Sequence, residues 1–229
     1  MRFSGFRSKT AVMILAAAAT TSAFGYWGYG ELRAYQLRDE ITALVKDTSQ
    51  RMQFALSIDA PPIAVDNPVL LRKFYEHAEA VDAHLRELQG ENVAAVGDLA
   101  NAADDYLLTS REILLRWASS QRYRVKLSGS IKTLQVHMRA DDGSPAWIIE
   151  AVRSKEQVEE DYRDYKRAVN ALGTLLGTFP AARRKIAPYL DTALLADEKL
   201  VATARARTLV ASASAAKEME TVRQLHTYR

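Results

Sequence analysis

The chain has 229 residues and no cysteine, which excludes disulfides and thiolate chemistry. It carries 31 basic and 28 acidic residues, a formal net charge of +3. Three of the basic residues, Arg2, Arg7 and Lys9, precede the first acidic residue, Glu31, so the remainder holds equal numbers of each sign. Because the excess of positive charge belongs to the N-terminus alone, the composition gives no support for a nucleic-acid partner.

The N-terminal segment predicts export from the bacterial cytoplasm. Residues 10–30 contain no charged side chain and end in a cluster of aromatic residues: Phe24, Tyr26, Trp27 and Tyr29. As a helix the segment would be about 31 Å long, which matches a hydrocarbon core of about 30 Å. Short basic flanks stay in the cytoplasm and aromatic rings favour the headgroup layer. We therefore expect residues 1–30 to be a retained signal anchor in the inner membrane, and residues 31–229 to form one periplasmic domain.

Cleavage is the alternative fate of this segment. Its core is rich in alanine, and Thr21-Ser22-Ala23 fits a small-residue cleavage site. Cleavage after Ala23 would release the same domain as a soluble protein of the periplasm.

Beyond residue 30 the hydrophobic pattern is helical almost throughout. The first stretch, residues 31–57, contains neither glycine nor proline and continues the anchor outward. Asn67 predicts an N-cap with Pro68 at the first helical position, and Gly90 marks the end of that helix. A third, amphipathic helix is expected to begin near Asn92.

Residues 121–138 fit two structures. Apolar and basic side chains alternate from Tyr123 to Leu127 and are followed by Ser-Gly-Ser, which predicts a β-hairpin. At helical spacing the same stretch carries an unbroken apolar stripe: Tyr123, Leu127, Ile131, Leu134 and Met138. We expect the helix, because an isolated two-stranded ribbon needs further packing to be stable.

Ser144 and Pro145 predict the start of the next helix, because serine caps helices and proline suits their first position. The apolar residues of this helix follow the heptad alternation of a bundle seam: Val158, Tyr162, Tyr165, Val169, Leu172, Leu176 and Phe179. We expect Pro180 to close the helix and Pro188 to open the last one. Small residues line the seam of the last helix, which allows close helix approach: Leu194, Val201, Ala204, Thr208, Ala211 and Ala215, followed by Val222.

Long helices joined by short loops predict an all-α fold, an elongated antiparallel bundle of four to five helices that follows the signal-anchor helix. The seams of the last two helices supply either the core or a dimer interface. The candidate interface residues are Tyr162, Tyr165, Ala204, Ala211 and Ala215.

The sequence lacks the motifs that support catalysis. His77 and His84 share a helix face, but no metal-binding motif accompanies them. No glycine-rich phosphate loop is present, and the serine pair at Ser119 lacks a positioned base. We therefore expect a protein that is not an enzyme and that uses neither a metal ion nor a cofactor.

A run of six basic residues without an acidic one lies between Ile113 and Arg139. Its members are Arg116, Arg122, Arg124, Lys126, Lys132 and Arg139. One interpretation is an anion site, in which guanidinium groups grip a carboxylate or phosphate beside aromatic rings. The candidate ligand-binding residues are Arg116, Arg122, Arg124, Trp117 and Tyr123.

The other interpretation of the basic run is structural. When the chain folds back on itself, Lys126 lies level with Glu160, and Arg122 lies level with Asp164. Acidic residues of the following helix would then neutralise the run across the helical hairpin. Trp117 and Trp147, on opposite sides of the turn, are more often core anchors than parts of a ligand cage.

The basic N-terminus, the apolar span ending in aromatic residues and the long heptad helices make the chain similar to one known architecture. It resembles the extracytoplasmic helical-bundle sensor modules of bacterial chemoreceptors and histidine kinases. Those receptors return through a second membrane span to a cytoplasmic output, whereas Thr221–Arg229 is polar. The resemblance therefore implies a sensor that signals in trans.

Three functions are expected from these observations. The first is a membrane-tethered extracytoplasmic helical bundle that binds another envelope protein, as a scaffold or accessory subunit, or that associates with itself. The second is a sensor of a small anionic ligand that signals in trans. The third is the same bundle as a soluble periplasmic protein after signal cleavage.

Overall fold

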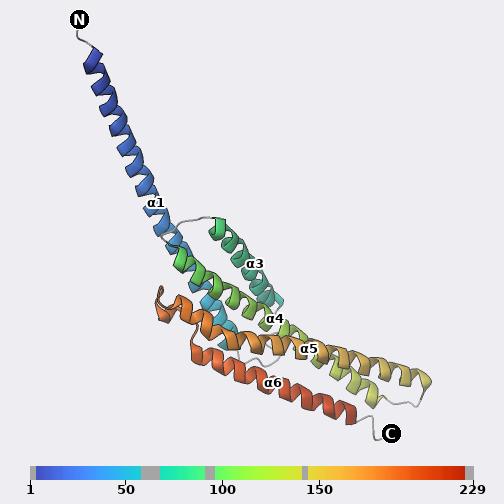
Figure 1. Ribbon diagram of the computed structural model, residues 1–229. Coiled ribbons are helices and arrows are strands. Elements are labelled where there is room, and N and C mark those ends of the chain that lie inside the picture. The colour runs from blue at the N-terminus through green and yellow to red at the C-terminus, as the bar shows by residue number, and fades with distance from the viewer. Residues whose placement is uncertain (1–3, 58–67, 91–95, 141–143, 225–229) are drawn as a thin grey trace.

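The computed structural model describes residues 4–57, 68–90, 96–140 and 144–224. Five α-helices contain nearly all of these residues, and no described residue lies in a strand, so the all-α class is confirmed. The first, α1 (Ser4–Ser57), projects at its N-terminal end far beyond the other helices (Figure 1). The predicted anchor falls largely on residues 1–27, whose side chains lie outside the described part.

Helix α3 (Pro68–Gly90) begins and ends where the sequence places it. The predicted cap at Asn67 and the predicted helix start near Asn92 lie outside the described residues. Among the described residues, no helix offers a stretch long and apolar enough to cross a membrane.

Two long helices, α4 (Gly97–Arg139) and α5 (Pro145–Ile186), make the most extensive helix pair of the molecule. Helix α4 runs through residues 121–138 without a break, so the predicted helix is confirmed there and the hairpin is excluded. Ser144 caps α5 as predicted, because its Oγ accepts a hydrogen bond of 3.1 Å from the backbone N–H of Trp147. The two helices run antiparallel and form the long axis of the fold (Figure 1).

Pro180 does not close α5, which continues to Ile186. A proline inside a helix removes one backbone hydrogen bond and usually kinks or ends it. Here Phe179, Ala182 and Ile186 on the same helix are buried in the core, and their packing keeps the segment helical. Tertiary packing therefore overrides the local signal.

The last helix, α6 (Glu198–Gln224), also begins later than Pro188 predicts. The short 3-10 helix η2 (Thr192–Leu194) intervenes, and Asp191 caps it through the backbone N–H of Ala193 at 3.0 Å. Asp197 then accepts a 2.9 Å hydrogen bond from the backbone N–H of Lys199 at the start of α6. Asp197, rather than the proline, therefore caps the start of α6, after the η2 turn that Asp191 caps.

The buried apolar residues form two clusters along the long axis. The larger, which we call the proximal core, lies where α1, α3, α4 and α5 meet the start of α6, and its aromatic members are Phe74, Tyr106, Trp117 and Phe179. The smaller, the distal core, joins α4, α5 and α6 through Leu127, Leu134, Val158, Tyr165, Val169, Ala215 and Met219. Ring contacts reinforce the proximal core, since Phe74 meets Trp117 edge to face with centroids 5.4 Å apart.

Candidate functional site

The free end of the α4–α5 hairpin projects beyond the described end of α6. Gly173 of α5 lies beside Thr208 of α6, and Gly177 lies beside Arg205, which fixes the register of these antiparallel helices. At this register Gln224 is level with a residue about three turns into α5. In the part of the chain that the structure describes, the tip of the hairpin therefore has no third helix over it (Figure 1).

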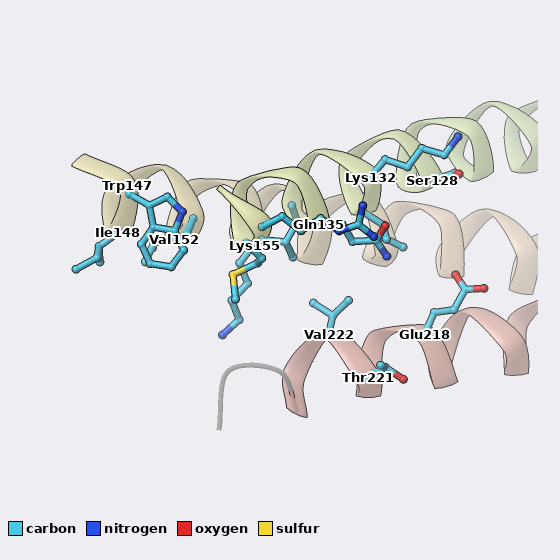
Figure 2. Close-up of a pocket in the computed structure, with 15 residues that line it drawn as sticks. Ser128, Lys132, Gln135, Trp147, Ile148, Val152, Lys155, Glu218, Thr221 and Val222 are labelled. Carbon is cyan, nitrogen blue, oxygen red and sulfur yellow. The ribbon is translucent and has the colours of Figure 1, made fainter. Parts of the chain in front are cut away.

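A cavity of about 900 Å³ opens between this tip and the end of α6, and we call it the distal groove. Three helices line it, as Figure 2 shows. The lining residues are Ser128, Ile131, Lys132, Leu134, Gln135, Met138 and Arg139 of α4, Trp147, Ile148, Ala151, Val152 and Lys155 of α5, and Glu218, Thr221 and Val222 of α6.

Most of the surface of the distal groove is apolar. Ile148 is 53% exposed and Val152 is 41% exposed, although both are large aliphatic side chains. In Figure 2, Val222 of α6 points across the gap toward the side of the groove formed by α4 and α5. A contiguous apolar surface of this kind usually marks a site for a ligand or a partner.

Three cations border this apolar surface, namely Lys132, Arg139 and Lys155, against one acid, Glu218. Within the described ranges, none of the three cations has an acidic partner within 4.0 Å. Figure 2 shows the Lys155 side chain extending from α5 toward the end of α6, whereas Glu218 lies at the other end of the groove from Trp147. The groove therefore combines an apolar lining with a rim of net positive charge.

Hydrogen bonds between α4 and α5 hold the tip of the hairpin in shape. The indole Nε1 of Trp147 donates to the carbonyl of His137 at 2.6 Å. Nδ1 of His137 lies 2.7 Å from the hydroxyl of Ser154. These contacts, together with the cap at Ser144, fix the Trp147 ring at the edge of the groove before any ligand arrives.

A buried carboxylate lies between α4 and α5, farther from the hairpin tip than the distal groove. Asp161 of α5 has no exposed surface, and it accepts hydrogen bonds from Lys126 Nζ at 2.7 Å, from Gln157 Nε2 at 2.9 Å and from the hydroxyl of Ser130. Burial alone raises the pKa of Asp161, but the three donors outweigh it and lower the pKa below its usual value. The cluster therefore locks the register of α4 against α5.

A second, smaller cavity of about 500 Å³ lies between α1 and α3. Its buried member is His77, whose Nε2 lies 3.1 Å from the Thr48 hydroxyl and whose Nδ1 lies 3.3 Å from Asp47. A neutral imidazole satisfies both contacts, since Nδ1–H donates to the carboxylate and Nε2 accepts from the hydroxyl. Burial lowers the pKa of His77, and so does the charge of Arg51. Among the residues described, no three His, Cys, Asp or Glu side chains are placed to hold a metal ion.

Comparison with known proteins gives no relative from which to assign this geometry. No protein-family model, no curated protein and no solved structure matches the chain. The site must therefore be interpreted from its own residues.

The predicted ligand-binding residues do not come together, and none of them lines the distal groove. Nε of Arg116 lies 3.7 Å from Oε2 of Glu112 on the same helix. The Trp117 ring is buried against Phe74 in the proximal core. Arg122 is exposed, while Tyr123 packs against the distal core. Arg124 is half-buried, close enough to influence the hydroxyl of Tyr165.

The predicted pairing of the basic run with α5 is observed for Lys126, but with Asp161 rather than with Glu160. The register of α4 against α5 brings the carboxylate of Asp161, the residue after Glu160, to Lys126. No ion pair between Arg122 and Asp164 is found; Asp164 lies 3.4 Å from Arg167 instead.

The candidate interface residues lie at helix contacts within the chain. Tyr165, Ala204 and Ala215 are buried, and Tyr162 and Ala211 are half-buried. Of the two uses that the sequence left open, core or interface, this placement matches the core.

Sequence reasoning missed most of the distal groove. Lys132 and Arg139 belong to the basic run, and Trp147 was expected only as a core anchor. Val222 belongs to the predicted seam of the last helix, but Lys155 gave no signal, because which helices meet at the hairpin tip depends on where α6 ends relative to α5. The observation that could have drawn attention to the tip is the apolar group Trp147-Ile148-Ile149, directly after a helix start.

Proposed function

We propose that this chain is a ligand-binding helical-bundle module of the bacterial envelope. In this proposal residues 1–30 anchor it to the inner membrane, the antiparallel bundle stands in the periplasm, and the distal groove takes the ligand. The bound module then acts on another envelope protein in trans, without catalysis of its own. If the N-terminal segment is cleaved instead, the same module works as a soluble periplasmic protein.

The distal groove is the observation that carries this proposal. Its volume of about 900 Å³ falls within the range of roughly 300–1,000 Å³ that is usual for small-molecule sites. Such sites have apolar linings with a few converging polar groups, which is the composition found between α4, α5 and α6. The groove also lies at the opposite end of the molecule from the start of α1 (Figure 1), where a tethered protein is accessible.

Binding of a neutral, environment-sensitive dye such as Nile red tests the site without assuming the ligand's charge. The full chain in lipid nanodiscs should bind the dye, and Ala151→Trp, which fills the groove, should weaken binding about tenfold or more. Ala181→Trp places the same side chain at an exposed position of α5 and is the matched control. Equal dye binding by the two variants would rule the groove out as the site.

A second candidate function is that of a scaffold that docks an envelope protein along α6. Leu209 and Val210 are 61% and 68% exposed on this helix, which favours a protein contact there. Leu209→Glu with Val210→Glu should then abolish a crosslink formed in native membranes, while Ala151→Trp leaves it unchanged. A crosslink that survives the paired substitution would exclude this surface.

A further inference from the structure

The distal groove extends along α4. Its lining residues on α4 run from Ser128 to Arg139, a length of about 16 Å along the helix. Apolar side chains of three helices follow this length, among them Leu134, Val152 and Val222. Such a shape suits an extended, flexible apolar chain better than a compact ring system.

The polar groups of the groove are unequally distributed between cations and acids. Arg139 and Lys155 stand on the α4–α5 side, where Figure 2 shows Lys155 reaching toward the end of α6. Lys132 lies at the same end of the groove as Glu218 and offsets its charge there (Figure 2), whereas Glu218 is the one acid among the described lining residues and lies away from Trp147. An anionic head is therefore favoured most beside Arg139 and Lys155, which gives the ligand a direction in the groove.

We infer that the distal groove binds a single-chain amphiphile with an anionic head, with its tail along Leu134, Val152 and Val222 and its head at Arg139 and Lys155. This inference rests on the proposed function and adds the chemistry of the ligand. A carboxylate and a phosphate monoester share the chemistry that the two cations recognise.

A small amphiphile accounts for the groove better than an acidic helix of another protein does. Stable protein interfaces bury about 1,200–2,000 Å² in total, which requires a broad contact surface. A cavity of about 900 Å³ between three helices instead has the dimensions of a small-molecule site. The apolar lining is favourable for an acyl tail because each buried methylene group adds to the affinity.

Photocrosslinking tests this inference on the full chain in lipid nanodiscs. The probe is dodecanoate with a photoreactive group at the end of its tail, and crosslinked peptides are identified by mass spectrometry. Labelling is expected in residues 128–139, 145–155 and 218–222, and unlabelled dodecanoate should compete. Dodecyl phosphate should compete as well, and the stronger of the two competitors identifies the head, whereas dodecyltrimethylammonium should not compete.

Charge-neutralising variants make the test specific. Arg139→Gln with Lys155→Gln should weaken dodecanoate binding about tenfold or more, since hydrogen bonds to charged groups are the strong ones. Arg122→Gln with Lys166→Gln removes the same net charge from exposed positions of the same two helices and should change nothing. Arg139→Lys with Lys155→Arg should largely retain binding, because both positions keep a cation.

Several results would overturn the inference. Equal competition by the cationic amphiphile would show that the head is not recognised. Labelling that is unchanged by the paired Arg139 and Lys155 substitutions would show the same. Labelling of a variant that ends at Gln224, but not of the full chain, would show that residues 225–229 occupy the groove. A crosslink between two copies through the groove would identify a dimer contact instead.

These failures are distinguishable from a failure of the proposed function. If Nile red binding is lost in Ala151→Trp while no anionic amphiphile competes, the groove is a ligand site and only the ligand class is wrong. If neither dye nor amphiphile depends on Ala151→Trp, both proposals fail together.

Discussion

The proximal core and the distal groove present similar apolar side chains under opposite conditions. Met52, Tyr106 and Phe179 are almost completely buried, because α1 and α3 cover the α4–α5 pair there. At the other end of the same helix pair, Ile148 and Val152 remain exposed, although large aliphatic residues of this kind usually lie in a core. Burial thus follows from how many helices reach a given level of the hairpin, and the level that the described helices leave open is the one that can accept a ligand.

The largest effect is expected in the proximal core. Phe179 is fully buried, and its ring lies 5.5 Å from that of Tyr106. Phe179→Ala should lower the free energy of unfolding by about 3–5 kcal/mol, because it removes apolar contacts and leaves a cavity. Chemical denaturation followed by circular dichroism measures this. A loss of under about 1 kcal/mol would show that this end is as loosely packed as the groove.

A smaller effect is expected at the buried carboxylate that joins the two regions. Asp161→Ala leaves Ser130 and Gln157 without their acceptor and should cost about 2 kcal/mol. The pKa of Asp161 is lowered in the folded state, so its contribution is complete well above the unfolded value of about 3.9 and is lost as the pH falls through the folded pKa. Asp161→Asn should therefore flatten the acid limb of the stability curve, which urea titrations at several pH values detect. Glu160→Asn, one residue away and exposed, is the control.

His77 should give the same sign of pH dependence as Asp161, but in a higher pH window. Its pKa is lowered because burial and Arg51 oppose the charged form. The unfolded chain then binds a proton more readily, so stability should fall as the pH drops below about 6.5. His77→Gln should abolish the dependence in that window, whereas His84→Gln, at an exposed position, should leave it intact. An unchanged slope in His77→Gln would assign the dependence to another group.

The sequence predicted the helices more accurately than it predicted their ends and mutual positions. Ser144-Pro145 marks a helix start because the cap is a local contact, and the stripe through residues 121–138 is helical because its period is local too. Pro180 and Pro188 do not mark the helix boundaries that they predict. Core packing carries α5 past Pro180, and α6 begins well after Pro188, where Asp197 caps it. These outcomes depend on contacts between segments that are distant in sequence.

The candidate site is predicted less well than the helices, because it depends even more on contacts between segments that are distant in sequence. The basic run predicts either an anion site or pairing with the following helix; Lys132 and Arg139 border the groove, whereas Lys126 pairs with Asp161. Arg116 and Trp117 are neighbours in sequence, but the Trp117 ring packs against Phe74 in the proximal core, and neither residue lines the groove. Lys126 was paired one residue away from its true partner, Asp161, because the rotation of α5 about its axis is set by packing.

The smallest expected effect on stability lies in the groove itself. Ile148 is a large aliphatic residue that is more than half exposed, so Ile148→Ala should change the free energy of unfolding by no more than about 0.5 kcal/mol. The same substitution should weaken the binding of dodecanoate, since it removes apolar surface that the tail would cover. Denaturation and binding are measured on one preparation, with Ile186→Ala in the proximal core as the inverse case, destabilising without touching the groove. If Ile148→Ala costs as much stability as Ile186→Ala, the tip is already covered within the folded chain, and the contrast between a closed core and an open groove fails.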